Sequence, residues 1–302
     1  MHRGEPSLFW VHACLVAVQL GFASHHVASK VVLRELSPGA LSLVRAASAA
    51  AVLFAVHAAR RGLPRVPLRD LPLLSACALL GIAANQVCFF EGLARSTAIN
   101  ASVLVTTIPV FTVLTAIALR KEPASGRTLL GVAVALAGAL YLVGVEAFEL
   151  GPHTMVGDGL IALNALFYGV YLVLVTPLVQ RHGSLTVVVW LFALGSLWIA
   201  PYGARDLVLE APALGLGAWA LVAVIVLVAT VFTYLANAWA LKHAPASIVA
   251  IYIYLQPIAA AALAVAVLGE AVTSRVALAS LLVFTGIYLV TRRVTSAPPT
   301  DR

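Results

Sequence analysis

Residues 108–138 read IPVFTVLTAIALRKEPASGRTLLGVAVALAG, and residues 256–286 read QPIAAAALAVAVLGEAVTSRVALASLLVFTG. One proline, the glutamate, one arginine and the last glycine of the first stretch recur 148 positions later in the second: Pro109 and Pro257, Glu122 and Glu270, Arg127 and Arg275, Gly138 and Gly286. Gly21 and Gly169 share this offset. Prolines and glycines mark bends and close helix contacts, so composition alone does not explain the common offset. The sequence therefore predicts two similar halves.

The composition places the chain in a membrane. Of its 302 residues, 62% are hydrophobic and 10% are charged, with a mean hydropathy of +1.02. A spanning helix needs about 20 mostly apolar residues. Ten such runs are predicted: 8–28, 38–59, 70–93, 97–119, 126–145, 156–179, 185–203, 214–239, 245–268 and 274–292.

These runs do not alternate as barrel strands do, and lipid leaves no backbone group unpaired, so we expect helices. The predicted fold is an all-α integral membrane protein of ten helices, five in each half. We expect the first repeat over residues 8–145 and the second over 156–292, with a central cavity between them. No cleavable signal peptide is apparent, so the first run is expected to stay as a span.

Basic residues cluster at helix ends, so the net charge of +7 is not read as a sign of nucleic-acid binding. If both termini lie on one side, that side holds thirteen Lys and Arg residues and the other side holds five, with Arg45 inside a span. By the positive-inside rule, the termini are predicted to be cytoplasmic, in the cell (inner) membrane. An odd number of spans per half then inverts the second half relative to the first.

Each half resembles an EamA unit of the drug/metabolite transporter superfamily. In the first half the matching stretches are Leu20-Gly21-Phe22, Ser37-Pro38, Gly92-Leu93-Ala94, Ile108-Pro109-Val110-Phe111 and Arg120-Lys121-Glu122. In the second they are Tyr168-Gly169-Val170-Tyr171, Gln256-Pro257, Leu268-Gly269-Glu270 and Gly286-Ile287-Tyr288. Two departures stand out: Leu20 replaces the usual tryptophan, and Arg45 corresponds to Ala193 in the second half.

The resemblance implies a secondary carrier of small metabolites, often an exporter, in a family that includes exporters of amino acids. The predicted mechanism is alternating access, in which the two halves rock around a site near the middle of the membrane. A neutral lining rich in aromatic and amide groups favours amino-acid-like or mildly amphipathic solutes. The carrier's expected partners are a small-molecule substrate and the lipid bilayer, without nucleic acid. A homodimer is left open, because Gly131, Ala135 and Ala139 give one helix a small-residue face.

Polar residues inside the predicted spans are the candidate substrate ligands. They are Gln19, Asn85, Gln86, Asn164, Tyr168, Tyr234, Asn237, Tyr252 and Gln256. Tyr234 and Asn237 share a helical face with Thr230, and Tyr252 lies one turn before Gln256. The alternative is that these groups only join helices by hydrogen bonds. Pro109 and Pro257 are candidate hinges, since each frees a carbonyl near the middle of its span, and a static kink is the alternative.

Two charged residues, Glu91 and Arg45, each have a structural and a functional interpretation. Glu91 either pairs with Arg95 four residues on or couples transport to protons. Arg45 either extends toward the membrane surface or contacts an anionic substrate group.

An enzyme or a metal site is not expected. No HExxH, CxxC or carboxylate-pair pattern occurs, and the adjacent His25 and His26 point about 100° apart on a helix. We therefore predict no metal and no cofactor. The competing class is a membrane-embedded sensor or scaffold without transport activity.

Overall fold

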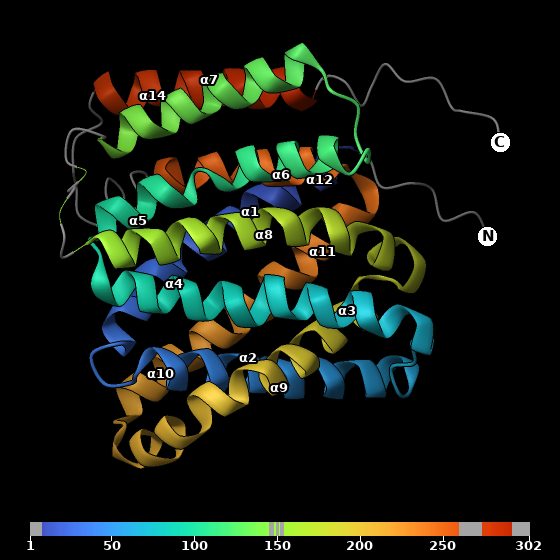
Figure 1. Cartoon of the computed structure of the whole chain (residues 1–302), viewed down its shortest axis with the longest axis vertical. Helices are drawn as coiled ribbons and strands as arrows, with labels where there is room; N and C mark the ends of the chain where they lie inside the picture. Colours follow the sequence, from blue (N-terminus) through green and yellow to red (C-terminus); the bar gives the residue numbers. More distant parts are fainter. Residues whose placement is uncertain (1–7, 145–147, 149–150, 152–153, 260–273, 292–302) are drawn as a thin grey trace.

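The computed structural model describes residues 8–144, 148, 151, 154–259 and 274–291. Within these residues every regular element is a helix, and the helices lie side by side as a bundle (Figure 1). Helix α1 begins and α14 ends at the same end of the bundle, on the right of Figure 1. We call this the terminal end and the opposite one the far end.

The helices of the first half are α1 (Leu8–Val32), α2 (Pro38–Arg61), η1 (Leu68–Asp70), α3 (Leu71–Ala78), η2 (Leu79–Ala83), α4 (Ala84–Arg95), α5 (Ala98–Val105), α6 (Ile108–Ala118) and α7 (Gly126–Val143). Those of the second half are α8 (Met155–His182), α9 (Ser184–Glu210), η4 (Ala211–Ala213), α10 (Leu216–Val226), η5 (Leu227–Phe232), α11 (Thr233–His243), α12 (Ala246–Ile251), η6 (Tyr252–Tyr254) and α14 (Ser274–Thr291).

Seven helical segments among the described residues are long and apolar enough to cross a membrane. Shorter apolar helices at Phe9–Ala23, Ala246–Ala259 and Ala277–Thr291 fall within the first, ninth and tenth predicted spans. The predicted ninth span, 245–268, ends outside the described residues, and the count of ten crossings stays a prediction. Large apolar side chains face outward as lipid requires, with exposures of 63% to 88% at Leu197, Val208, Leu216 and Leu281.

Equivalent helices of the two halves pack against each other in opposite directions. At the far end, the start of α2 meets the end of α9, where the Ser37 backbone N–H donates to Glu210 Oε2 at 2.7 Å. At the terminal end, His57 Nε2 lies 3.0 Å from Thr186 Oγ1. Helices α7 and α14 are likewise antiparallel, as inverted repeats require, because Arg275 Nε at the start of α14 donates to the Tyr141 carbonyl near the end of α7 at 2.7 Å.

Glycines let α7 and α14 approach closely, and Gly138 and Gly286, which share the 148-residue offset, are among them. A Cβ at Gly286 would lie 2.5 Å from the Gly131 carbonyl oxygen and from Ala135 Cβ. A Cβ at Gly131 would lie 2.9 Å from the Gly286 carbonyl oxygen. The small-residue face predicted on this helix therefore packs against α14.

The third and eighth spans each contain a π-helical turn, η2 at Leu79–Ala83 and η5 at Leu227–Phe232. Their first residues are 148 positions apart, which is the offset of the sequence repeat. A π turn shifts the helical hydrogen-bond pattern and is often found at functional sites. The duplication thus preserves a backbone irregularity as well as residue types.

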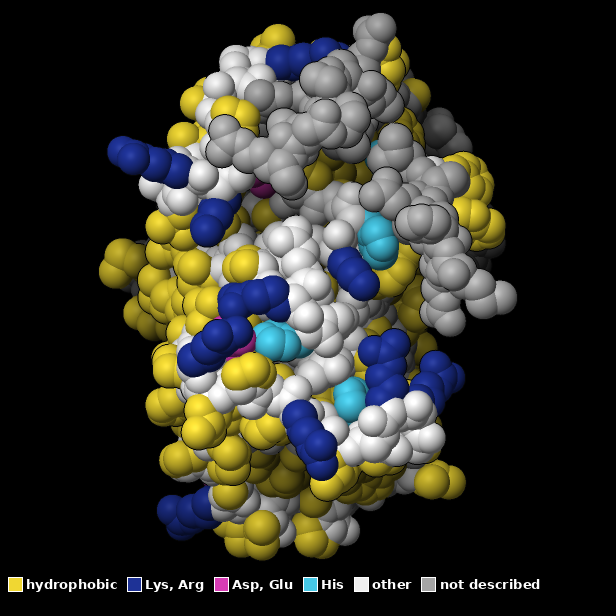
Figure 2. All heavy atoms as spheres, turned by 90° about the vertical axis from the view of Figure 1, so that its right-hand side faces the viewer, with side chains coloured by type: hydrophobic (Ala, Val, Ile, Leu, Met, Phe, Trp, Pro, Cys, Tyr) yellow, Lys and Arg dark blue, Asp and Glu magenta, His cyan; other side chains and the backbone are white. Residues whose placement is uncertain are grey.

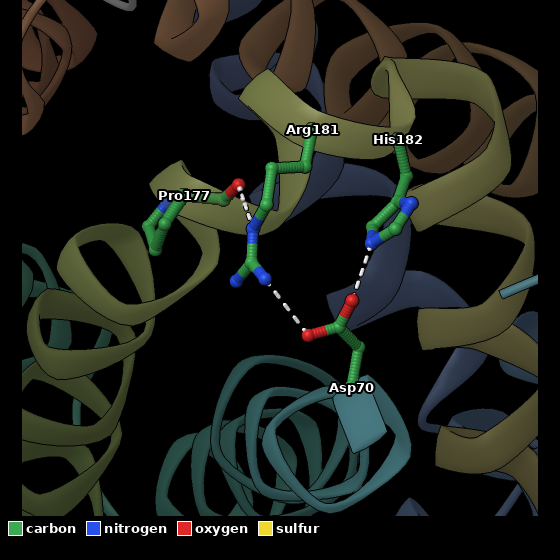
Figure 3. Close-up of polar contacts among 4 residues, drawn as sticks. All are labelled: Asp70, Pro177, Arg181 and His182. Atoms are coloured by element: carbon green, nitrogen blue, oxygen red, sulfur yellow. Dashed lines mark hydrogen bonds and ion pairs between the residues drawn. The ribbon is translucent and has the colours of Figure 1, made fainter. Parts of the chain in front are cut away.

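Helix α8 is clamped to the first half at both ends. At the terminal end, Asp70 accepts from Arg181 Nη1 at 2.9 Å and contacts His182 Nε2 at 2.7 Å, while Arg181 Nε donates to the Pro177 carbonyl (Figure 3). At the far end, Asp158 accepts from Ser96 Oγ at 2.5 Å and from Asn100 Nδ2 at 3.1 Å. These contacts hold α8 in the centre of the bundle.

The terminal end is strongly basic. Figure 2 shows this face, on which Lys and Arg side chains outnumber the acidic ones. The described cations at the helix ends and loops there are Arg60, Arg61, Arg65, Arg69, Arg120, Lys121, Arg127, Arg181 and Lys242. The far end carries Arg34, Arg95, Arg205 and Arg275. The charge asymmetry anticipated from the sequence is therefore present on the folded bundle.

Candidate functional site

A cavity lies in the middle of the bundle, between the two repeats. The space in it that a water-sized molecule can occupy is about 70 Å³, which is smaller than an open small-molecule site. Nine residues predicted from the sequence line it: Gln19, Arg45, Asn85, Gln86, Asn164, Tyr168, Tyr234, Asn237 and Gln256. Its apolar lining was not predicted and consists of Phe22, Phe89, Val105, Ile108, Leu172, Val249 and Ile253.

Two asparagines join the third and sixth spans in the cavity wall. Asn85 Nδ2 donates to the Asn164 carbonyl at 3.3 Å, and Asn164 Nδ2 donates to the Asn85 carbonyl at 2.9 Å. This reciprocal pair occupies the amide nitrogens with backbone partners in the opposite repeat. Interhelical bonding, the alternative reading of the polar residues, therefore describes this pair well.

Two tyrosines of the second repeat, Tyr168 and Tyr234, also line the cavity. The Tyr168 hydroxyl accepts from Asn237 Nδ2 at 3.0 Å, and the Tyr234 hydroxyl donates to the Gly81 carbonyl at 3.2 Å. Gly81 lies in the π turn η2, so a side chain of the second repeat contacts the irregular backbone of the first. The Tyr168 and Tyr234 rings meet edge to face, with centroids 6.4 Å apart.

Gln256 lines the cavity and Tyr252 does not, although only one helical turn separates them. Gln256 Nε2 donates to Gln19 Oε1 at 2.9 Å, which joins the ninth span to α1 beside the cavity. Tyr252 does not line the cavity, because its hydroxyl contacts His12 Nδ1 and its ring stacks on that imidazole. The turn Tyr252–Tyr254 is a 3₁₀ helix, which rotates side chains by about 120° per residue instead of 100°. The predicted shared face is therefore lost.

Some buried polar atoms of the lining have no hydrogen-bond partner among the described residues. Both amide atoms of Gln86 are in this state, although only 1% of the residue is exposed. Asn237 Oδ1 is a second example. An unsatisfied buried polar group costs free energy, and contact of these atoms with a bound solute stays a prediction.

Arg45 is 3% exposed and lies in the cavity wall. Its Nε donates to Thr230 Oγ1 at 2.6 Å, and its Nη2 donates to the Ala229 carbonyl at 3.3 Å. Both acceptors belong to the π turn η5. The guanidinium also lies 5.9 Å from the centroid of the Phe90 ring. Arg45 thus points into the bundle rather than toward the membrane surface, and its contact with an anion stays a prediction.

Glu91 lies outside the cavity lining. Its carboxylate forms an ion pair with Arg95 and accepts a hydrogen bond from the Tyr202 hydroxyl. The predicted pair at i, i+4 is therefore present, while the proton-coupling role stays a prediction.

Both hinge candidates lie next to a break in the helix. The fourth span is divided at residues 106–107, and Pro109 lies in the first turn of α6. The Thr106 and Thr107 hydroxyls donate to the carbonyls of Val103 and Leu104 at 2.5 and 2.6 Å. The ninth span changes to 3₁₀ geometry at the equivalent place, just before Pro257. The break is a structural fact, and its movement stays a prediction.

The described residues contain no group of three or more His, Cys, Asp or Glu side chains that could hold a metal ion. The side chains of His25 and His26 lie outside the described residues, as does Glu270. Cys14, Cys77 and Cys88 are free thiols.

Comparison with known proteins decides the family. The family model described as the EamA-like transporter family matches twice, over residues 9–144 and 155–292. The chain belongs to the EamA-like transporter family. Its cavity therefore lies between two EamA units of a multi-pass membrane protein, and this family is one of transporters rather than enzymes.

Relatives of this EamA-like transporter carry related names. An "Uncharacterized transporter" of Archaeoglobus fulgidus is 28% identical over 93% of this chain and 97% of its own length. A "Probable terminal-alkyne amino-acid exporter" of Streptantibioticus cattleyicolor is 30% identical over 62% of each chain. A solved crystal structure matches with a TM-score of 0.77 at 18% identity, over 95% of this chain and 99% of that one. This last likeness shows the fold alone.

Proposed function

We propose that this EamA-like transporter is a secondary carrier that exports small amino-acid-like or mildly amphipathic metabolites. The observation that carries the proposal is the cavity between the repeats, with its amides, tyrosines and one arginine. Amide and hydroxyl groups bind the polar head of such a solute, and Phe22, Phe89 and Ile253 provide contacts for an apolar side chain. The name of the Streptantibioticus relative, an amino-acid exporter, supports the same class.

The proposed mechanism is alternating access, in which the two repeats rock around the cavity and open it to one side at a time. Two features support it. Equivalent helices run antiparallel, and the fourth and ninth spans are interrupted at equivalent positions beside Pro109 and Pro257. The interruptions have lost part of the helical hydrogen bonding, so bending there costs less than in a continuous helix.

We place the protein in the cell (inner) membrane with the terminal end in the cytoplasm, on the basis of the basic surface in Figure 2. The substrate and the lipid bilayer are the proposed partners. A homodimer remains a separate proposal that the packing of Gly131 against α14 does not support, because that face is used within the chain.

The test is transport by the purified protein in liposomes loaded with a pool of labelled L-amino acids, with and without an imposed pH gradient. We expect saturable flux that falls strongly in Gln256→Ala and persists in Tyr252→Phe. Of these two residues, Gln256 lines the cavity, whereas Tyr252 contacts His12. A folded protein that moves no solute would overturn the carrier proposal and favour the alternative, a sensor or scaffold.

A further inference from the structure

We propose that Arg45 and Gln86 form a carboxylate-binding site in the central cavity, so that the exported solutes are carboxylic acids, zwitterionic amino acids included. This inference rests on the proposed transport function and names the chemical group that the cavity selects. Three observations support it: the position of Arg45, the Gln86 amide, which has no hydrogen-bond partner in the described part of the chain, and a second basic cavity at the terminal end.

The first observation is the charge of the lining. Among the described residues that line the cavity, Arg45 alone carries a formal charge. A buried cation inside a membrane is costly and is generally retained for function. An anionic group on the solute would stabilise such a positive charge, and a carboxylate is the anionic group of amino-acid-like metabolites.

The second observation is how Arg45 is held. Its Nε and Nη2 atoms are occupied by the Thr230 hydroxyl and the Ala229 carbonyl, which are neutral acceptors and fix the plane of the guanidinium. The π turn that supplies both acceptors belongs to the opposite repeat. A planar guanidinium oriented in advance binds a carboxylate with better geometry than a flexible lysine would.

The third observation is the amide of Gln86, one helical turn before Phe90, whose ring faces the Arg45 guanidinium. Gln86 lines the cavity and is buried, and neither of its amide atoms has a partner in the described residues. Its nitrogen can donate to a carboxylate oxygen, and its oxygen can accept from an ammonium group. The combination fits the two charges of a zwitterion.

A second cavity supports the same chemistry. It lies at the terminal end between the ends of α6, α8 and α11 and the start of α12, with a volume of about 430 Å³. Lys121, Lys242 and His243 line it, and the chain contains only one other lysine, Lys30. The acidic residue of this lining, Glu122, is engaged with the backbone N–H and hydroxyl of Ser247. A cavity lined by cations concentrates anionic solutes at the side from which an exporter is loaded.

The arrangement makes the site asymmetric. The position equivalent to Arg45 in the second repeat is Ala193, and the position equivalent to Gln86 is Tyr234. Tyr234 instead donates to the Gly81 carbonyl in the π turn of the first repeat. The duplicated scaffold thus carries its cation in one half, which gives the solute one orientation.

The experiment compares matched solutes on the wild-type protein in liposomes. The probes are L-leucine, L-phenylalanine and L-methionine, each beside its C-terminal amide, which lacks only the carboxylate. We expect at least one acid to be transported and its amide to be transported at least tenfold less well. Equal transport of acid and amide would overturn the carboxylate site and leave the carrier proposal intact. No flux of either would count against the carrier proposal, and this inference would fall with it.

The second arm uses variants and the melting temperature of the purified protein. The transported acid should raise the melting temperature of the wild type, of the control Arg34→Gln at the exposed far end and, more weakly, of Arg45→Lys. It should not raise that of Arg45→Gln. Stabilisation of Arg45→Gln equal to that of the wild type would contradict the proposal. If Arg45→Gln does not fold, the acid–amide comparison on the wild type still decides the question.

Discussion

Arg45 Nε and Thr230 Oγ1 lie 2.6 Å apart, although 185 positions separate the two residues in the chain. The contact joins the second span of one repeat to the π turn of the other. Because the Thr230 hydroxyl itself donates to the Ile225 carbonyl at 2.8 Å, its lone pairs face the guanidinium. The orientation of the cation in the cavity is thus set by the opposite repeat.

Thr230→Val should weaken transport without unfolding the protein. Valine keeps the shape of threonine but removes the acceptor for Arg45 Nε, and a hydrogen bond to a charged group contributes about 1.5–3 kcal/mol. We expect KM for the transported solute to rise roughly tenfold or more. The control is Thr112→Val, whose hydroxyl donates to the Ile108 carbonyl within its own helix. Equal KM values for Thr230→Val and the wild type would show that the contact does not position the cation.

Gly286→Ala should destabilise the bundle, because its new Cβ would lie 2.5 Å from the Gly131 carbonyl oxygen. Overpacking of this kind costs about 1–3 kcal/mol, since α7 and α14 must separate. The measurement is thermal unfolding in detergent. Gly159→Ala is the matched control, because a Cβ there meets nothing within 4 Å. If both variants melt at the same temperature, the close approach of α7 and α14 is wrong.

The orientation in the membrane can be read by labelling single cysteines. Cys14, Cys77 and Cys88 would first be replaced by alanine. Arg34→Cys lies in the exposed far-end loop between α1 and α2, and Arg65→Cys lies in the exposed terminal-end loop after α2. An impermeant maleimide added to intact cells should label Arg34→Cys alone and should reach Arg65→Cys only after permeabilisation. The reverse pattern would invert the proposed topology.

The repeats and much of the cavity lining could be predicted from the sequence because their determinants are local. A proline, a glycine or an amide stands out in an apolar run wherever the helix lies. Gln86, Asn237 and Gln256 were found in this way.

Other features depend on backbone geometry that helical periodicity does not contain. The 3₁₀ turn at Tyr252–Tyr254 rotates Tyr252 away from the cavity, and the π turn at Leu227–Phe232 removes Thr230 from the face of Tyr234 and Asn237 that lines it. The direction of a long side chain such as Arg45 depends on partners from the other half of the chain. No residue pattern marks either irregular turn.

Glu91→Gln distinguishes the two roles given to this carboxylate. Glu91 contacts Arg95 and Tyr202 away from the cavity lining, so we expect its loss to leave the response of transport to a pH gradient unchanged. The measurement is flux in liposomes with and without the gradient. A gradient response that disappears in Glu91→Gln, with flux retained, would instead assign proton coupling to this residue.

The most direct test of the central claim, that the cavity is the transport site, is the variant Gln86→Leu. Its amide has no partner among the described residues, so leucine removes an unsatisfied buried group at nearly constant volume. The account predicts a melting temperature equal to or above that of the wild type, together with loss of flux in liposomes. Undiminished flux through a stably folded Gln86→Leu protein would contradict it.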